Sequence, residues 1–313
     1  MKKNSELFEI SQEDSSERID SYLSKKMNIQ RNKILLLIKD NMVKVNSINV
    51  KPSYIIKKDD QISVELLSRE INEINPENIP LDIVYEDKNL IIINKPRGML
   101  THPTPKVKSG TLVNALLYYT KNLSLDFGVE RAGIVHRLDK DTSGLLIITK
   151  NSETHNYIAK LLKERKIEKR YLALVYGNIN ENFARVTLPL INDHRMRRIK
   201  VSNTGKFALT DISVKERFGD YTLLDIRIHT GRTHQIRVHL SYIGHPVVGD
   251  TVYGFRNRDE DIRGQLLHSY KLSFVLPTSR ELSTFIAPLP IEFSNFLNKL
   301  KNKPPNNESH FTK

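Results

Sequence analysis

Residues 131–148 read RAGIVHRLDKDTSGLLII, a polar segment that leads directly into an apolar one. The apolar run from Leu145 to Thr149 predicts a strand. Asp139 lies just before Thr142-Ser143-Gly144, a run typical of a turn. By pattern alone Asp139 is a turn-capping residue, and Asp141 fits that role better. Asp139 becomes a candidate for chemistry only together with the segments described below.

On both sides of this stretch, apolar residues recur with either strand or helix spacing. Strands are predicted over Leu81–Glu86, Leu90–Asn94, Arg170–Tyr176, Phe207–Phe218, Tyr221–His229, Leu272–Val275 and Leu282–Ile286. Helices are predicted over Thr111–Asn122, Ser152–Lys163 and Thr233–Ile243, and a last helix begins at Pro290. Because many strands have helices scattered among them without regular βαβ alternation, we expect an α+β fold over residues 81–301.

The first part of the chain has a separate pattern. Two helices, Glu17–Met27 and Arg31 to about Asp40, precede short strands that turn at Asn46-Ser47. This pattern predicts a small domain over residues 14–66. The polar stretch 67–80 contains two prolines and predicts a linker, and the polar residues 302–313 predict a disordered tail.

The composition favours a polyanionic partner. The chain has 313 residues, no cysteine and a formal net charge of +13. Residues 1–75 hold 13 basic and 12 acidic residues, whereas residues 76–313 hold 36 and 24. A basic excess is typical of proteins that bind nucleic acid, because neutralising phosphates releases counterions. No apolar run suits a membrane helix and no secretory signal is recognisable, so we expect a cytoplasmic protein.

Motifs for common cofactors and metals are missing from the sequence. Neither a GxxxxGK[ST] phosphate loop nor a GxGxxG turn after a strand occurs, so we expect no nucleotide cofactor. The missing cysteines exclude disulfides, thiolate metal ligands and cysteine nucleophiles. His229, His234 and His239 are spaced by five, which puts them on different faces of a helix, and we expect no metal site.

Two further segments combine polar residues with apolar flanks. In KRYLALVYG at 169–177, Tyr171 lies in the predicted strand Arg170–Tyr176, and pattern alone favours a half-buried structural role for it. In TGRTHQIRVHL at 230–240, Arg232 and His234 lie at a strand-to-helix turn. A helix N-terminus attracts anions, although an exposed arginine at a solvated helix start is the plainer interpretation.

Taken together, these segments resemble the RluA/RluD-type family of RNA pseudouridine synthases. The motifs INKPRGMLTHP at 93–103, RAGIVHRLDKDTSG at 131–144, KRYLALVYG at 169–177 and TGRTHQIRVHLSYIGHPVVGDTVYG at 230–254 follow the family's order. The likeness covers residues 81–298. The domain at 14–66 resembles the αL-type RNA-binding fold of a small-subunit ribosomal protein, which many family members carry at the N-terminus.

The resemblance implies a mixed β-sheet domain with a central cleft that isomerises uridine without a cofactor. It implies that Asp139 is the catalytic aspartate, that Tyr171 stacks on the detached uracil, and that Arg232 is the ion-pair partner of Asp139. Arg137 would help to displace the target base. The other residues expected to bind RNA are His136, Arg31, Lys33, Lys169, Arg195, Arg197, Arg198 and His234.

The sequence leaves the RNA target open. We expect large-subunit ribosomal RNA, and transfer RNA is the alternative within the same family. A non-catalytic RNA-binding assembly factor would not need Asp139, Tyr171 and Arg232 together. An RNA methyltransferase would need a glycine-rich nucleotide loop, which the sequence lacks. We expect the protein to be a monomer.

Overall fold

The chain folds into two compact units in the computed structural model, one up to Glu73 and one from Ile74 onward. The structure describes residues 3–27, 31–67, 74–193, 195–196, 198–255, 262 and 264–302. Each unit has a hydrophobic core of its own. In the described part of the chain, every helix is too short or too polar to cross a membrane.

The first unit packs two helices on a four-stranded antiparallel sheet. As predicted, α1 (Ile19–Lys26) and α2 (Arg31–Lys39) precede the hairpin of β2 (Val43–Val45) and β3 (Ile48–Asn49). The core joins Ile19 and Leu23 of α1, Ile34 of α2 and Ile62 of β4 (Gln61–Leu67).

An additional strand shows that the predicted start at residue 14 is too late. β1 (Lys3–Glu9) pairs with β4 along its whole length and forms an edge of the sheet. Its residues are mainly polar, and Leu7 is 76% exposed. The strand therefore lacks the apolar alternation by which a half-buried strand is recognised.

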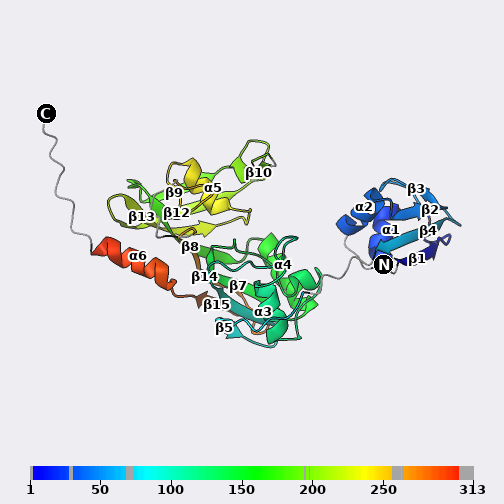
Figure 1. Ribbon diagram of the computed structural model, residues 1–313, viewed down its shortest axis with the longest axis horizontal. Helices are drawn as coiled ribbons and strands as arrows, with labels where there is room; N and C mark the ends of the chain where they lie inside the picture. Colours follow the sequence, from blue (N-terminus) through cyan, green and yellow to red (C-terminus); the bar gives the residue numbers. More distant parts are fainter. Residues whose placement is uncertain are drawn as a thin grey trace. The chain divides into compact units, whose positions relative to one another are not determined.

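The second unit is built on a nine-stranded mixed sheet in the order β5-β6-β7-β14-β8-β13-β12-β9, with β15 paired to β14. Only the pairing of β7 with β14 is parallel among these ladders. Figure 1 shows β9, β12 and β13 at one end of this unit and β5, β7 and β15 at the other. The strands are β5 (Ile83–Glu86), β6 (Leu90–Lys95), β7 (Ser143–Thr149), β8 (Glu168–Tyr176), β9 (Phe183–Thr187), β12 (Leu209–Arg217), β13 (Tyr221–Ile228), β14 (Leu267–Val275) and β15 (Leu282–Ile286).

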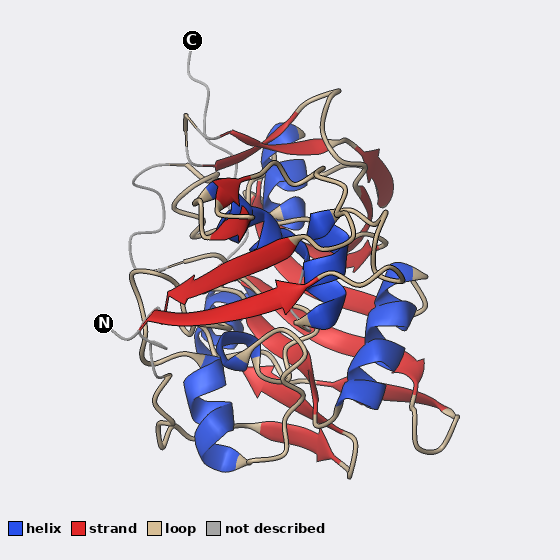
Figure 2. Ribbon diagram, turned by 90° about the vertical axis from the view of Figure 1, so that its right-hand side faces the viewer, coloured by secondary structure: helices blue, strands red, loops and turns tan. Residues whose placement is uncertain are grey.

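Helices cover both faces of this sheet, and Figure 2 shows them interspersed among the strands. Ile91 and Ile93 of β6 share one core with α3 (Leu112–Tyr119) and α5 (Gln235–Tyr242), whereas Leu90 and Ile92 share another with α4 (Ser152–Lys163). Successive side chains of a strand point to opposite faces, so β6 is apolar without a break from Leu90 to Ile93. The last helix, α6 (Ile291–Lys301), packs through Phe293 and Leu297 on a further cluster.

The predicted linker 67–80 is too long. Ile74 packs against the core of the second unit, and the backbone amide of Glu77 donates to the carbonyl of Asn114 over 3.0 Å. The Glu77 carboxylate also accepts from the amide of Gly110. The segment between the units is therefore no longer than 68–73, which lies outside the described residues, as does most of the predicted tail, 303–313.

Three strands of the second unit were not predicted. They are β9 and the separate hairpin of β10 (Leu190–Asp193) and β11 (Arg198–Val201). They are short, and their exposed faces carry large apolar or charged side chains such as Phe183 and Arg198. The sequence pattern of such short strands is weak, and whether they form depends on pairing with neighbouring strands.

Candidate active site

A cleft of about 410 Å³ brings together side chains from the three segments that the sequence singled out. It lies in the second unit, between the loop before β7, strand β8 and the start of α5. It is lined by Val135, His136, Arg137, Leu138, Asp139, Thr142, Leu162, Lys163, Lys169, Tyr171, Ile228, Gly231, Arg232, Thr233, His234, Gln235, Ile236, Arg237 and Leu267.

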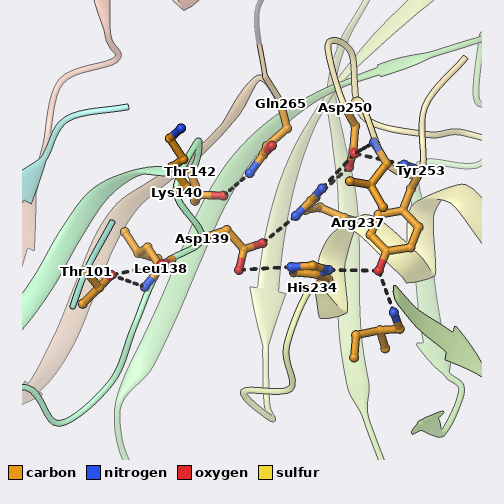
Figure 3. Close-up of polar contacts among 12 residues, drawn as sticks. Thr101, Leu138, Asp139, Lys140, Thr142, His234, Arg237, Asp250, Tyr253 and Gln265 are labelled. Carbon is orange, nitrogen blue, oxygen red and sulfur yellow. Dashed lines mark hydrogen bonds and ion pairs between the residues drawn. The ribbon is translucent and has the colours of Figure 1, made fainter. Parts of the chain in front are cut away.

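The loop that carries Asp139 is held on both sides of the aspartate. On one side, the Thr101 hydroxyl donates to the carbonyl of Leu138 over 3.0 Å and accepts from its amide over 3.3 Å (Figure 3). On the other, the fully buried Lys95 ammonium donates to the carbonyl of Lys140 over 3.1 Å. Burial lowers the pKa of Lys95 to about 7, although Asp141 and Asp139 oppose this shift. The backbone therefore fixes where the carboxylate points.

Arg237 of α5 is the cation that pairs with Asp139. Its Nη1 donates to Oδ2 of Asp139 over 2.9 Å, and its Nε and Nη2 donate to the two oxygens of Asp250 over 2.7 and 2.8 Å (Figure 3). The Arg237 side chain is only 5% exposed. Burial acts to lower the pKa of Arg237, but the two carboxylates outweigh it and raise the pKa. Arg237 is thus a permanent positive charge that holds Asp139 and Asp250 together.

The prediction that Arg232 pairs with Asp139 is wrong. Arg232 precedes α5, and its Nε donates instead to the carbonyl of Phe207 over 3.0 Å. Both Arg232 and Arg237 belong to the motif at 230–240, so choosing between them as the partner of Asp139 depended on the geometry of the helix. Residues three apart share a helix face, and Arg237 follows His234 by three, which is the signal that could have identified it.

His234, predicted to bind RNA, lies beside the aspartate. Its Nε2 is 3.8 Å from Oδ1 of Asp139, and its Nδ1 is 2.9 Å from the hydroxyl of Tyr253. It adopts a left-handed backbone with φ of 53° at the cap of α5. Burial lowers its pKa, although the nearby Asp139 acts in the opposite direction. Tyr253 and Asp250 were not singled out from the sequence.

Tyr171 lies in the middle of the sheet and faces the cleft. Its strand β8 runs between β13 and β14, with Tyr171 opposite Ile226 on one side and Ser269 on the other. The residue is 6% exposed, and burial raises the pKa of its phenol to about 12. It is therefore a neutral phenol at physiological pH.

The remaining predicted residues fall in different places. Arg137 and Lys169 line the cleft, and burial lowers the pKa of Lys169 to about 8. His136 also lines the cleft, but its Nε2 accepts from the amide of Ile147 over 3.0 Å. Arg195 and Arg198 are exposed at the β10–β11 hairpin, and Arg31 pairs with Asp20 in the first unit over 2.8 Å. Arg197 and the side chain of Lys33 lie outside the described residues.

A second, more polar hollow of about 270 Å³ adjoins the cleft. The two share Leu162, Lys163, Lys169, Ile228, Gly231 and Arg232. The described residues that line the hollow include the basic side chains of Lys163, Arg165, Lys169, Arg227, His229 and Arg232 and no carboxylate. The guanidinium of Arg165 is held over the ring of Phe207, 5.5 Å from its centroid. The hollow is therefore a concentration of positive charge next to the cleft that holds Asp139.

Comparisons with known proteins agree on one family. Residues 89–242 match the family model described as RNA pseudouridylate synthase, and they include Asp139, Tyr171 and Arg237. The chain is 41% identical over 293 residues to an uncharacterized RNA pseudouridine synthase of Bacillus subtilis (strain 168), covering 93% of this chain and 96% of that protein. It is 39% identical over 298 residues to ribosomal large subunit pseudouridine synthase D of Borreliella burgdorferi, covering 92% and 91%. The structure of human RNA pseudouridylate synthase domain containing 1 superposes with a TM-score of 0.55 at 27% identity, covering 74% of this chain and 98% of that one.

Proposed function

Since this chain belongs to the RNA pseudouridine synthase family, we propose that it isomerises uridines of large-subunit ribosomal RNA, with Asp139 acting on the ribose. The observation that carries the proposal is the position of Asp139, paired with Arg237 in a cleft that also holds Tyr171. The choice of RNA rests on relatives named ribosomal large subunit pseudouridine synthase D, which are 37–40% identical. Transfer RNA is the alternative target within the family.

The reaction needs a carboxylate and no redox step. The N1–C1′ bond of uridine breaks, the uracil turns, C5 joins C1′, and the proton displaced from C5 is balanced by one taken up at N1. A carboxylate at the ribose can add to C1′, stabilise electron deficiency there, or take a sugar proton. Asp139 suits each of these roles because it lies in the cleft with its carboxylate held in place by the hydrogen bond from Arg237.

Tyr171 holds the uracil while it is detached. The ring of Tyr171 faces the cleft, and an aromatic face can stack on a free base. Because burial raises the pKa of its phenol to about 12, Tyr171 works through its ring and as a neutral hydrogen-bonding group. At neutral pH we do not expect Tyr171 to be ionised, and therefore do not expect it to remove the C5 proton as a phenolate.

Substrate entry requires the target nucleotide to leave its stack. A base within a helix cannot reach a cleft of this kind, so the nucleotide is flipped out. Arg137 is exposed at the cleft, where its side chain can fill the vacancy in the RNA. The basic hollow beside the cleft binds the flanking phosphates, and Arg232 contributes there rather than at Asp139.

The first unit is proposed as an RNA-binding domain of the αL type. Its two helices followed by small strands have the expected order. The exposed part of α2 carries Arg31, which also pairs with Asp20.

The decisive experiment replaces the carboxylate. Asp139→Ala and Asp139→Asn are expected to form no pseudouridine in large-subunit ribosomal RNA, mapped by carbodiimide labelling, while RNA binding survives. Asp82→Asn is a matched control, because Asp82 is exposed and bonds Asn94 away from the cleft. An Asp139→Ala variant with full activity would overturn the proposed role, and modification of transfer RNA alone by the wild type would overturn the proposed substrate.

A further inference from the structure

The hydroxyl of Tyr253 connects the active site to the β10–β11 hairpin. It accepts from the backbone amide of Ile199 in β11 over 2.9 Å. It also lies 2.9 Å from Nδ1 of His234, whose other ring nitrogen faces Asp139 (Figure 3). A backbone amide can only donate, so at Ile199 the phenol oxygen is the acceptor. The hydroxyl hydrogen is then free to point at Nδ1.

This arrangement determines which nitrogen of His234 carries the proton. Among the described residues, Nδ1 is the acceptor recorded for the Tyr253 hydroxyl. If the hydroxyl donates to Nδ1, that nitrogen is unprotonated and the proton of the neutral ring is on Nε2. Nε2 is the atom 3.8 Å from Oδ1 of Asp139. The N–H bond of the imidazole is therefore directed at the carboxylate.

Tyr253 also supports the second partner of Asp139. Its ring lies against the guanidinium of Arg237, 5.1 Å from carbon to centroid, and meets the ring of His234 edge-on at 5.6 Å. Its backbone amide donates to Asp250 over 3.0 Å, and Asp250 in turn holds Arg237. One tyrosine thus touches both groups that face the two oxygens of Asp139.

We propose that Tyr253 is a positioning residue, which directs the Nε2–H of His234 at Asp139 and ties both to β11. This inference rests on the proposed role of Asp139. Because the hairpin carries the exposed Arg198, RNA that binds the hairpin is mechanically linked to the two groups that face the aspartate. The charged groups that act on His234 are Asp139, Arg237, Asp250 and Arg137. Its neutral polar neighbour is the hydroxyl of Tyr253.

The test is Tyr253→Phe, which keeps the ring on Arg237 and removes only the hydroxyl. Without a donor at Nδ1 the neutral imidazole loses stabilisation, so His234 takes a proton more readily. We expect kcat to fall about tenfold near pH 8.5, where the neutral ring can carry its proton on Nδ1, and by less than about twofold at acid pH, where a protonated ring keeps its Nε2–H. KM for RNA should change less than kcat. Tyr157→Phe is the control, since it removes a hydroxyl bonded to the Val275 carbonyl over 3.1 Å in another part of the fold.

A second measurement does not depend on catalysis. In ¹H–¹⁵N spectra of the histidine side chains, wild-type His234 should show the Nε2–H form, and Tyr253→Phe should show a mixture or a protonated ring. An Nδ1–H form in the wild type, or a Tyr253→Phe pH profile that matches the wild type, would overturn the inference. If the wild type forms no pseudouridine but shows the Nε2–H form, the proposed function fails while the hydrogen bond from Tyr253 to His234 stands.

Discussion

The guanidinium of Arg237 lies 2.9 Å from the carboxylate of Asp139, although 98 residues separate them in the chain. The contact joins the loop before β7 to a helix that follows β13. Arg237 is anchored independently by its two bonds to the buried Asp250. Asp139 therefore receives a partner whose position does not depend on the substrate, which is the preorganisation that charge stabilisation requires.

Replacing Arg237 should damage activity and stability together. In Arg237→Gln, Asp139 loses its cation and Asp250 remains buried without one, so we expect a rate at least about 100-fold lower. Loss of one partner of a buried pair costs about 3–5 kcal/mol of unfolding free energy. Arg232→Gln is the matched control and should keep kcat within about twofold, since the Arg232 guanidinium bonds the Phe207 carbonyl and, among the described residues, makes no bond to Asp139. Equal loss of kcat in the two variants would contradict the assignment of Arg237.

Lys169 should act on RNA affinity through charge. It lies where the cleft and the basic hollow meet. If it contacts a phosphate, Lys169→Gln lowers the slope of log affinity against log salt by about 0.7–0.9. Lys88→Gln, an exposed lysine outside both hollows, should leave the slope unchanged. The measurement is a salt titration of binding to a ribosomal RNA fragment, with every variant made in the inactive Asp139→Asn protein. A slope that Lys169→Gln leaves unaltered would show that Lys169 does not contact an RNA phosphate.

The sequence was sufficient for most elements but not for their connections. Residues 90–93 and 145–148 are apolar without a break because both faces of β6 and β7 are covered there, and such strands are recognisable from the sequence alone. β1 and β9 are recognisable only through the strands with which they pair. At the site, the sequence motifs identified Asp139 and Tyr171 as candidates. Choosing Arg237 over Arg232 as the partner of Asp139 would have required predicting the first residue of α5 to within one position. Helix ends are the least predictable feature of a pattern.

Acid should destabilise the second unit through its buried histidines. His268 is fully buried between the Ser143 hydroxyl and the Ala287 carbonyl, and burial lowers its pKa to about 4. Between about pH 6.5 and pH 4 the unfolded chain binds a proton that the folded chain does not. The unfolding free energy therefore falls as pH falls through this window, by up to about 1.4 kcal/mol per pH unit for this group.

Denaturant titrations from pH 7 to pH 4 measure this slope. His268→Gln should be less stable at pH 7, because the new side chain packs less well, and its stability should depend less steeply on pH. A variant whose slope equals that of the wild type would show that His268 is not a source of the acid sensitivity.

The final prediction concerns the seam at which the two ends of the sheet meet. The parallel pairing of β7 with β14 consists of Ser143 opposite His268 and Gly144 opposite Ser269. A Cβ atom on Gly144 would lie 2.3 Å from the carbonyl oxygen of Ser269, and Gly144 also has a positive φ of 111°. Gly98 has a φ of 81°, but nothing lies within 4 Å of a Cβ atom there. Substituting each glycine by alanine therefore distinguishes two effects: backbone strain alone at Gly98, and strain together with a steric clash at Gly144.

Gly98→Ala should cost about 1–2 kcal/mol, which is the strain of a left-handed backbone alone. Gly144→Ala should lower the free energy of unfolding by about 4 kcal/mol or more, because the new Cβ would meet backbone atoms of Ser269 in a central strand, and these cannot move aside. It should also lower kcat, since the loop of Asp139 enters β7 at this point and a shifted carboxylate loses its alignment with Arg237. Chemical denaturation and single-turnover assays measure the two effects. Equal destabilisation by the two substitutions would show that the seam can open without cost and is not what positions Asp139.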